Sequence, residues 1–206
     1  MTPPGTFDRV YAAIRQRLRD GVYQPGERLE PATLAEELNA SVTPVRDALH
    51  RLTGERLVDA PRHEGFRVPM MTESLLRYLY AWHLDLLLLA VLKKQSTALA
   101  DVTTGVQGDA PVRVRQNMLF LALARTAGNP EHVAALEALS HRLEPVQRIE
   151  EFFLDETEAE TNDILAALKA RDRRGLRNSL VRYHRRRERV VPQLLAALFE
   201  RKTNAL

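Results

Sequence analysis

The hydrophobic pattern predicts three short helices in the first 70 residues. Apolar positions recur three or four residues apart in each of them: Val10, Ile14 and Leu18, then Leu34 and Leu38, and then Val45, Leu49 and Leu52. Gly21 follows the first run and Asn39 the second, and both residue types tolerate the left-handed conformation that ends a helix. The runs therefore predict helices over Thr6–Asp20, from Pro31 onward and from Thr43 onward.

The third helix begins with small polar residues and an arginine, in the stretch SVTPVR. Thr43 can cap the helix and Pro44 suits its first turn. Ser41, Thr43 and Arg46 gather at the N-terminal end, where free N–H groups attract phosphate. Taken alone, this sequence is also what a capped helix of the protein core would have at its N-terminus. The alternative reading is that this end contacts DNA.

Two short strands are expected after the third helix, at Leu57–Val58 and at Phe66–Val68, with Pro61–Gly65 as the hairpin tip between them. The order helix, helix, short turn, helix, hairpin is typical of a winged helix-turn-helix. In such a unit the third helix lies in the major groove and its N-terminal residues meet base edges and phosphates. The hairpin and the turn spacing therefore favour DNA binding over a simple core helix.

Beyond residue 71 the pattern changes to long helices, which predict an all-α bundle. They are expected at Thr72–Gln95, Val112–Thr126, Pro130–Phe153, Glu156–Ala170 and Arg173–Lys202. Pro145 and Pro192 should kink or split two of these helices, and Gly105–Pro111 reads as a loop. The predicted fold is mainly α, with a winged helix-turn-helix over residues 1–70 and a helical bundle over residues 71–206.

Composition narrows the class of protein. The 206 residues are 45% hydrophobic, and 30 basic residues face 27 acidic ones. No cysteine is present, which excludes disulfides and thiol chemistry. The run Leu84–Leu92 is too short for a membrane span, and no leader is visible, so a cytoplasmic protein without membrane contact is expected. The six histidines show no i, i+4 pairing, and no glycine-rich phosphate loop or nucleophile–base constellation indicates an enzyme.

Several segments at fixed spacing resemble the N-terminal domain of the GntR family of bacterial transcription regulators. They are PGERL at Pro25–Leu29, LAEELNAS at Leu34–Ser41, TPVRDAL at Thr43–Leu49, LV at Leu57–Val58 and GFRV at Gly65–Val68. The resemblance implies DNA contacts by Arg46 and Gly65 and by the helix start at Ser41, Thr43 and Pro44. It also implies contacts by Arg62 and His63 at the wing tip, although these two also read as solvated surface residues. Val42 stands where the family usually has an arginine.

The second region resembles the ligand-sensing FCD domain of the FadR-like branch, in its six-helix, VanR-like form. The supporting stretches are ARTAGNP at Ala124–Pro130, ILAALKARD at Ile164–Asp172 and LVRYHRR at Leu180–Arg186. The basic run Arg171–Arg189 holds nine arginines. It reads as the wet face of a helix whose other face is apolar, with some arginines paired to the acids of Glu150–Glu160.

Many members of this branch hold a divalent metal in the bundle with one aspartate and three histidines. By resemblance those four positions fall on Asn117, Leu121, Thr161 and His184. One imidazole cannot hold a metal tightly, because affinity needs several converging ligands, so no metal cofactor is expected. His83, Asn117 and His184 are candidate effector-binding residues that point inward. The competing interpretation is that each is a satisfied core or surface residue.

The resemblance implies a transcription regulator, expected to be a repressor, that binds a palindromic double-stranded DNA operator as a homodimer. One recognition helix reads too few base pairs to be selective, so two copies should bind an inverted repeat. A small-molecule effector would modulate the binding. The alternative is a constitutive DNA-binding regulator whose bundle only dimerises and has no ligand.

Overall fold

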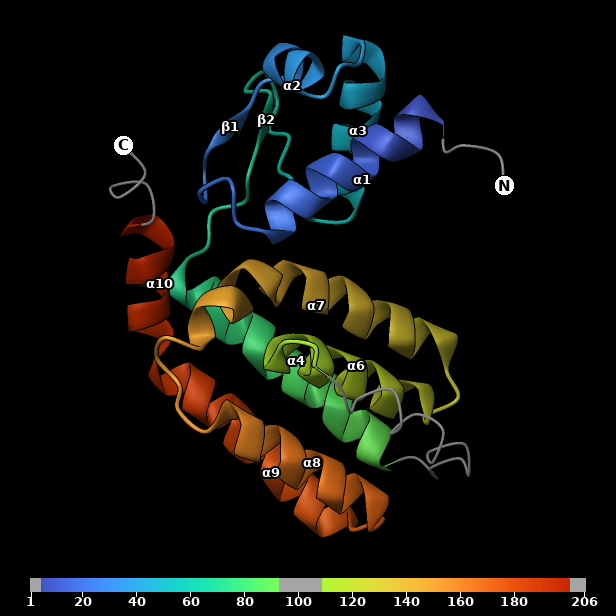
Figure 1. Ribbon diagram of the computed structural model, residues 1–206, viewed down its shortest axis with the longest axis vertical. Helices are drawn as coiled ribbons and strands as arrows, with labels where there is room; N and C mark the ends of the chain where they lie inside the picture. The colour runs from blue at the N-terminus through green and yellow to red at the C-terminus, as the bar shows by residue number, and fades with distance from the viewer. Residues whose placement is uncertain (1–4, 93–108, 201–206) are drawn as a thin grey trace. The chain divides into compact units, whose positions relative to one another are not determined.

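The computed structural model describes residues 5–92 and 109–200, and it confirms the predicted mainly α fold class (Figure 1). These residues divide into two compact units. The first contains the described residues up to Thr72 together with the described residues from Leu195 onward, and the second contains Glu73–Leu194. The domain boundary expected after residue 70 stays a prediction.

The first unit builds three helices around one apolar core. Its elements are α1 (Thr6–Arg19), β1 (Arg28–Leu29), α2 (Pro31–Glu37), α3 (Val42–Gly54) and β2 (Phe66–Arg67). The apolar positions that the sequence pattern identified, among them Val10, Ile14, Val45 and Leu49, are all buried in this core. Asn39 adopts the left-handed conformation expected of it, with φ of 48°. Arg9 donates to the carbonyl oxygen of Leu38 at 2.8 Å and so closes the C-terminal end of α2.

The strand pairing differs from the expected hairpin. β2 pairs antiparallel with β1, in the register Arg28 with Arg67 and Leu29 with Phe66. Leu57–Val58 is not a strand, because the N–H of Leu57 donates to the carbonyl oxygen of Leu52 at 3.0 Å and so belongs to the end of α3. The expected hairpin persists only as a single bridge between Asp59 and Arg67.

The start of α3 also differs from the expectation. Thr43 was expected to cap the helix, but Ser41 occupies the N-cap position and α3 begins at Val42. Thr43 and Pro44 lie inside the first turn instead. The first N–H groups of a helix have no intrahelical partner, so proline is accommodated there without the loss of a hydrogen bond.

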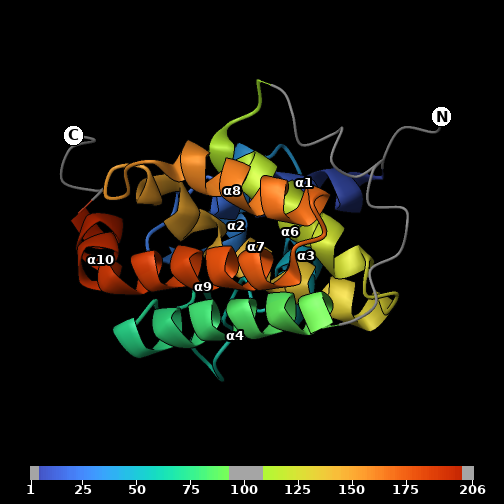
Figure 2. The ribbon, with the colours of Figure 1, turned by 90° about the horizontal axis from the view of Figure 1, so that it is seen from below.

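The second unit is a helical bundle. Its helices are α4 (Glu73–Leu92), α6 (Val112–Arg125), α7 (Pro130–Glu150), α8 (Thr157–Lys169), α9 (Arg173–Arg189) and the beginning of α10 (Val191–Glu200). α4 and α9 lie side by side, with α8 next to α9 (Figure 2). α7 continues through Pro145, whereas the last predicted helix is split at Val190, two residues before Pro192.

Two further expectations fall partly or wholly outside the described residues. Most of the predicted Gly105–Pro111 loop and the end of the predicted Thr72–Gln95 helix lie there, as does the stretch that bears on the number of bundle helices.

α4 is long and apolar enough to cross a membrane by length and composition alone. Eight of its residues are nevertheless buried inside the unit, which is what a core helix of a bundle requires.

Candidate nucleic-acid interface and bundle interior

α3 has one face fixed in the core and one face free. Val45, Ala48, Leu49 and Leu52 recur at helical spacing and are fully buried. On the opposite side Thr43, Arg46, Asp47 and His50 are exposed. A helix held by one apolar face presents its other side in a fixed orientation. This is the arrangement that a recognition helix needs to enter a major groove.

The predicted contact residues gather at the N-terminal end of α3. Ser41, Thr43 and Arg46 are exposed, and Pro44 is half-buried. Within residues 5–92 and 109–200, no hydrogen bond or ion pair holds the Arg46 side chain. A guanidinium in this position can reach a phosphate or the acceptor edge of guanine. Asp47, next to it, is also exposed.

The other predicted contact residues lie at the tip between Asp59 and β2. Arg62, His63 and Gly65 are exposed there. The N–H of Glu64 donates to the carbonyl oxygen of Pro61 at 3.2 Å, which closes a turn in which His63 has φ of 63°, and Gly65 follows the turn with φ of 75°. The ring of His50 on α3 packs edge-on against Phe66 of β2 at 4.9 Å. The wing, which is the segment from Asp59 through β2, thereby contacts α3 within the first unit.

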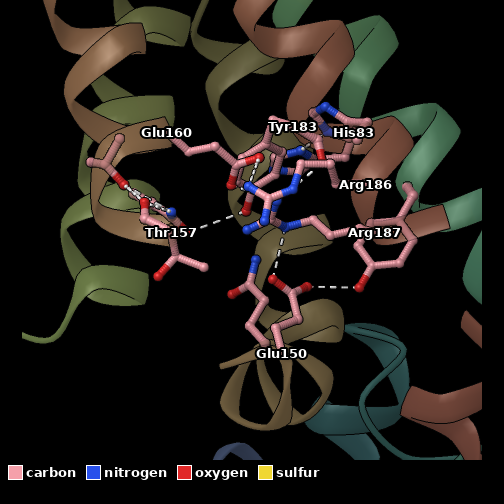
Figure 3. A network of polar contacts seen from close by, with 12 residues as sticks. His83, Glu150, Thr157, Glu160, Tyr183, Arg186 and Arg187 are labelled. Atoms are coloured by element: carbon pink, nitrogen blue, oxygen red, sulfur yellow. Dashed lines mark hydrogen bonds and ion pairs between the residues drawn. The ribbon is translucent and has the colours of Figure 1, made fainter. Parts of the chain in front are cut away.

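The interior of the bundle contains a buried network of charges centred on Arg187 of α9 (Figure 3). Its Nε donates to Glu150 Oε2 at 2.8 Å, and its Nη1 donates to Glu160 Oε2 at 3.0 Å. Nη1 of Arg186 lies 2.9 Å from the other oxygen of Glu160. The hydroxyl of Tyr80 donates to Glu150 at 2.7 Å. Two arginines and two glutamates therefore neutralise each other, with Arg187, Glu150 and Glu160 buried and Arg186 half-buried.

The pKa shifts follow from this burial and pairing. Burial opposes the charge of Arg187, but Glu150, Tyr183 and Glu160 outweigh it and hold the pKa of Arg187 above its ordinary value. Burial and the neighbouring Glu150 carboxylate raise the pKa of Tyr80 well above its usual range. The guanidinium of Arg187 also lies 3.3 Å from the centroid of the Tyr183 ring, so a cation–π contact covers one of its faces. At neutral pH Arg187 is charged and Tyr80 is neutral.

His83 and His184 form a neutral pair next to this network. His184 Nδ1 lies 2.7 Å from the carbonyl oxygen of Leu180. A carbonyl only accepts, so this nitrogen carries the proton and His184 Nε2 is an acceptor. His83 Nδ1 must then donate to it across 2.9 Å, which leaves His83 Nε2 as a buried lone pair without a partner.

Burial sets the charge state of both histidines. It lowers the pKa of His184 to about 3, with the Leu180 carbonyl opposing the shift and the Arg187 cation adding to it. Burial, His184 and Arg187 lower the pKa of His83 well below its ordinary value. Both imidazoles are therefore neutral at pH 7.

The polar side chains at the positions that the resemblance assigns to a metal are bonded to other groups of the bundle. Both nitrogens of His184 are engaged in hydrogen bonds. Asn117 is paired with Gln147 at 2.9 Å, and the Thr161 hydroxyl is bonded to Gln116 and to the Thr157 carbonyl. Leu121 has no donor atom. Among the described residues no group of three or more His, Cys, Asp or Glu side chains could hold a metal ion.

The structure brings two of the three candidate effector residues together and separates the third. His83 and His184 contact each other and are buried, whereas Asn117 is half-buried and bonded to Gln147. Arg187, Glu150, Glu160 and Tyr80 were not anticipated as a site. One signal for Arg187 was present, because it continues the buried spacing of Leu176, Leu180 and Tyr183.

Comparison with known proteins agrees with this geometry. Residues 6–68 match the profile of the family described as bacterial regulatory proteins, gntR family. The HTH-type transcriptional regulator McbR of Escherichia coli (strain K12) is 29% identical over 205 residues, which covers 91% of this chain and 90% of that protein. The HTH-type transcriptional repressor GlaR of the same organism is 34% identical over 64 residues, 31% of this chain and 29% of that protein.

Solved structures share the fold over more than nine tenths of the chain. The structure of E. coli McbR/YncC has a TM-score of 0.63 and 24% identity, and covers 97% of this chain and 99% of that chain. A putative GntR regulator from Rhodococcus sp. RHA1 has a TM-score of 0.72 and 20% identity, and covers 93% of this chain and 98% of that chain. The matched residues 6–68 include α3 and the wing. Residues 6–68 therefore form a domain of the gntR family of bacterial regulatory proteins, and the chain is a DNA-binding transcription regulator.

Proposed function

We propose that the protein is a repressor that binds a palindromic operator as a homodimer in the bacterial cytoplasm. The observation that carries the proposal is the recognition helix α3, whose apolar face is locked in the core while its N-terminal end is exposed. A single α3 spans only a few base pairs. Two copies related by a two-fold axis would read two half-sites about 34–36 Å apart, which gives the selectivity that one helix lacks. GlaR, named a repressor, is a relative over 64 residues.

The proposed contact residues have distinct roles. Arg46 reads guanine or grips a phosphate, and Ser41, Thr43 and Pro44 bring the start of α3 against the sugar–phosphate backbone. At the wing tip, Arg62 and His63 contact a phosphate or the minor groove, with Gly65 allowing the close approach of the backbone. These contacts position the protein and specify the base pairs that it selects.

Selection of binding sites from random double-stranded DNA tests the proposal. Full-length protein should enrich two mirrored half-sites with a fixed separation, because each copy contributes one α3 and one wing. Enrichment of a single asymmetric site, occupied by one chain, would rule out the dimeric palindrome reader. It would leave the protein a DNA-binding regulator of another kind.

We further propose that a small molecule modulates operator binding through the bundle, with His83, Asn117 and His184 as its candidate contacts. The alternative is a constitutive regulator whose bundle only dimerises. The buried network favours this alternative for carboxylate effectors, because Glu150 and Glu160 already neutralise Arg187 and Arg186. A thermal-shift screen with carboxylic acids and neutral metabolites separates the two. A rise in melting temperature with one of the compounds supports an effector. A melting temperature that no compound changes supports the constitutive regulator.

We propose that the bundle works without a metal cofactor. His184 is the one histidine left among the four positions, and both of its nitrogens are engaged. Elemental analysis of the purified protein should find no stoichiometric metal. About one metal ion per chain, lost in a His184→Ala variant, would contradict this.

A further inference from the structure

The exposed face of α3 carries an apolar side chain at the point where the helix begins. Val42 is the first residue of α3 and is 38% exposed. Its neighbour Ala40 packs against the apolar core of the first unit, but Val42 is not among the described residues that contact this core. Single exposed apolar residues are ordinary on protein surfaces. The significance of Val42 therefore depends on where it lies.

Helix stability does not account for a valine at this position. The first turn of a helix is stabilised by acidic side chains, and valine has a lower helix propensity than alanine or glutamate. α3 has no acidic residue in its first turn, and the side chain of Ser41 makes no capping hydrogen bond. The residues at the start of α3 are therefore not those that stabilise a helix best. Local departures of this kind are expected at functional positions.

Val42 lies on the same face of α3 as Arg46. Residues four apart on a helix are neighbours, with their Cβ atoms about 5–6 Å apart, and both side chains are exposed. The opposite face of the helix is fixed in the core, so the two side chains keep a constant orientation. Further along α3, the ring of His50 packs against Phe66 of β2. The N-terminal half of α3 is thus the part that is free to enter the major groove.

The spacing of Val42 and Arg46 matches that of stacked base pairs. Base pairs follow each other about every 3.4 Å, so side chains about 5–6 Å apart reach base pairs that are one or two steps apart. When Arg46 contacts a guanine, Val42 therefore lies against a base pair close to it. Most groups at the edges of base pairs in the major groove are hydrogen-bond donors or acceptors. The C5 methyl group of thymine is the apolar exception.

We propose that Val42 reads a thymine methyl group and so helps to determine which operator the protein selects. The valine side chain has no hydrogen-bonding atom, so it cannot recognise the polar edge of guanine, cytosine or adenine. Its two methyl groups can contact the C5 methyl of thymine and exclude water from it. The inference rests on the proposed function, in which the start of α3 contacts DNA, and it assigns one A·T base pair in each half-site.

Replacement of thymine by deoxyuridine in the selected operator tests the contact, because it removes only the C5 methyl group and keeps the base pair. Each thymine of the half-site is replaced in turn, and the affinity of the full-length protein is measured by mobility-shift titration at one salt concentration. At one position the wild-type protein should bind about fourfold more weakly, which corresponds to the burial of one methyl group. The same replacement in both half-sites should weaken binding about 15-fold.

Two variants connect this loss to Val42. Val42→Ser has no methyl group, so it should bind the thymine operator about fourfold more weakly than the wild type and should not distinguish it from the deoxyuridine operator. Val42→Thr keeps the shape of valine and one methyl group, so it should retain part of the distinction. Val42 lies on the outer face of α3, and the melting temperature of both variants should stay close to that of the wild type.

Val42→Arg gives an independent test through a change of specificity. Arginine donates two hydrogen bonds to the N7 and O6 atoms of guanine. Binding-site selection with this variant should therefore replace the A·T base pair assigned to Val42 by G·C. The base pair assigned to Arg46 should stay the same.

The outcomes separate this inference from the proposed function. The assignment of Val42 is overturned if no deoxyuridine operator binds the wild type more weakly, or if Val42→Ser shows the same loss with deoxyuridine as the wild type. In either case a loss of affinity in Arg46→Ala would leave α3 as the reading helix. If Arg46→Ala and Val42→Ser both bind the operator as the wild type does, the proposed contacts of α3 fail together with the inference.

Discussion

Arg187→Met is expected to lower the free energy of unfolding of the bundle by about 3–5 kcal/mol. Methionine fills much of the space of the arginine stem but carries no charge. Glu150 and Glu160, both buried, then lose the guanidinium that they share. A buried carboxylate without its partner costs far more than a solvated one.

Urea unfolding followed by Trp82 fluorescence measures this effect, since Trp82 lies on α4 in the same unit. Arg182→Met is the matched control. It removes an arginine from the same helix, but the Arg182–Asp163 pair is more than half exposed on both sides, so the expected cost is about 0–1 kcal/mol. Adding Glu150→Gln and Glu160→Gln to Arg187→Met should restore part of the stability. Equal losses in the Arg187 and Arg182 variants would show that the network is unimportant for the fold.

Acidification is expected to destabilise the bundle steeply below pH 6.5. His83 and His184 remain neutral in the folded state because burial lowers the pKa of each, that of His184 to about 3. Unfolded histidine has a pKa of about 6.5 and takes up a proton in this range. The unfolded state therefore binds more protons, and stability is lost as the pH falls from about 6.5 toward the folded pKa. His184, with a folded pKa of about 3, contributes about 1.4 kcal/mol per pH unit, or about 2 kcal/mol by pH 5, and His83 adds to the loss in the same direction.

The slope of unfolding free energy against pH, measured by Trp82 fluorescence between pH 7 and pH 5, tests the assignment. His83→Gln keeps a donor for His184 Nε2 but cannot titrate, so the slope should fall. His132→Gln is the control, because His132 is only half-buried and bonds to the Leu86 carbonyl at the surface of the same unit. An unchanged slope in His83→Gln would show that the pair is not the source of the acid sensitivity.

Much of the fold could be predicted because buried apolar side chains repeat with the period of the helix. Val10 and Ile14 of α1, like Val45 and Leu49 of α3, stand at positions that only a packed helix explains. The strand at Leu57–Val58 was predicted wrongly. Apolar and β-branched residue types favour a strand, but they do not determine which carbonyl oxygen accepts the backbone N–H. In the fold, Leu52 takes the N–H of Leu57 to end α3, with Arg56 in the left-handed conformation.

The interior of the bundle was less predictable for a related reason. Arg187 stands in a run of nine arginines, and a charged residue in such a run normally faces water. It is buried because Glu150 on α7 and Glu160 on α8 approach it from distant parts of the sequence. The residues next to Arg187 in the sequence do not indicate that two glutamates from other helices will pair with it. By contrast, the exposed Arg182 lies on the expected wet face of α9, although its partner is Asp163 and not one of the expected acids of Glu150–Glu160.

The measurement that tests the central claim most directly is a mobility-shift titration of the selected operator with wild-type protein and an Arg46→Ala variant at one fixed salt concentration. Arg46 is exposed and, in the described part of the chain, its side chain makes no hydrogen bond or ion pair, so its removal should leave the melting temperature unchanged. Binding should weaken by about 1–3 kcal/mol, the contribution of a good arginine contact to a base or phosphate. Arg51→Ala, at the other end of α3 and packed on Tyr11, is the control and should bind nearly as the wild type does. Equal operator affinity of wild type and Arg46→Ala would contradict the assignment of α3 as the helix that reads DNA.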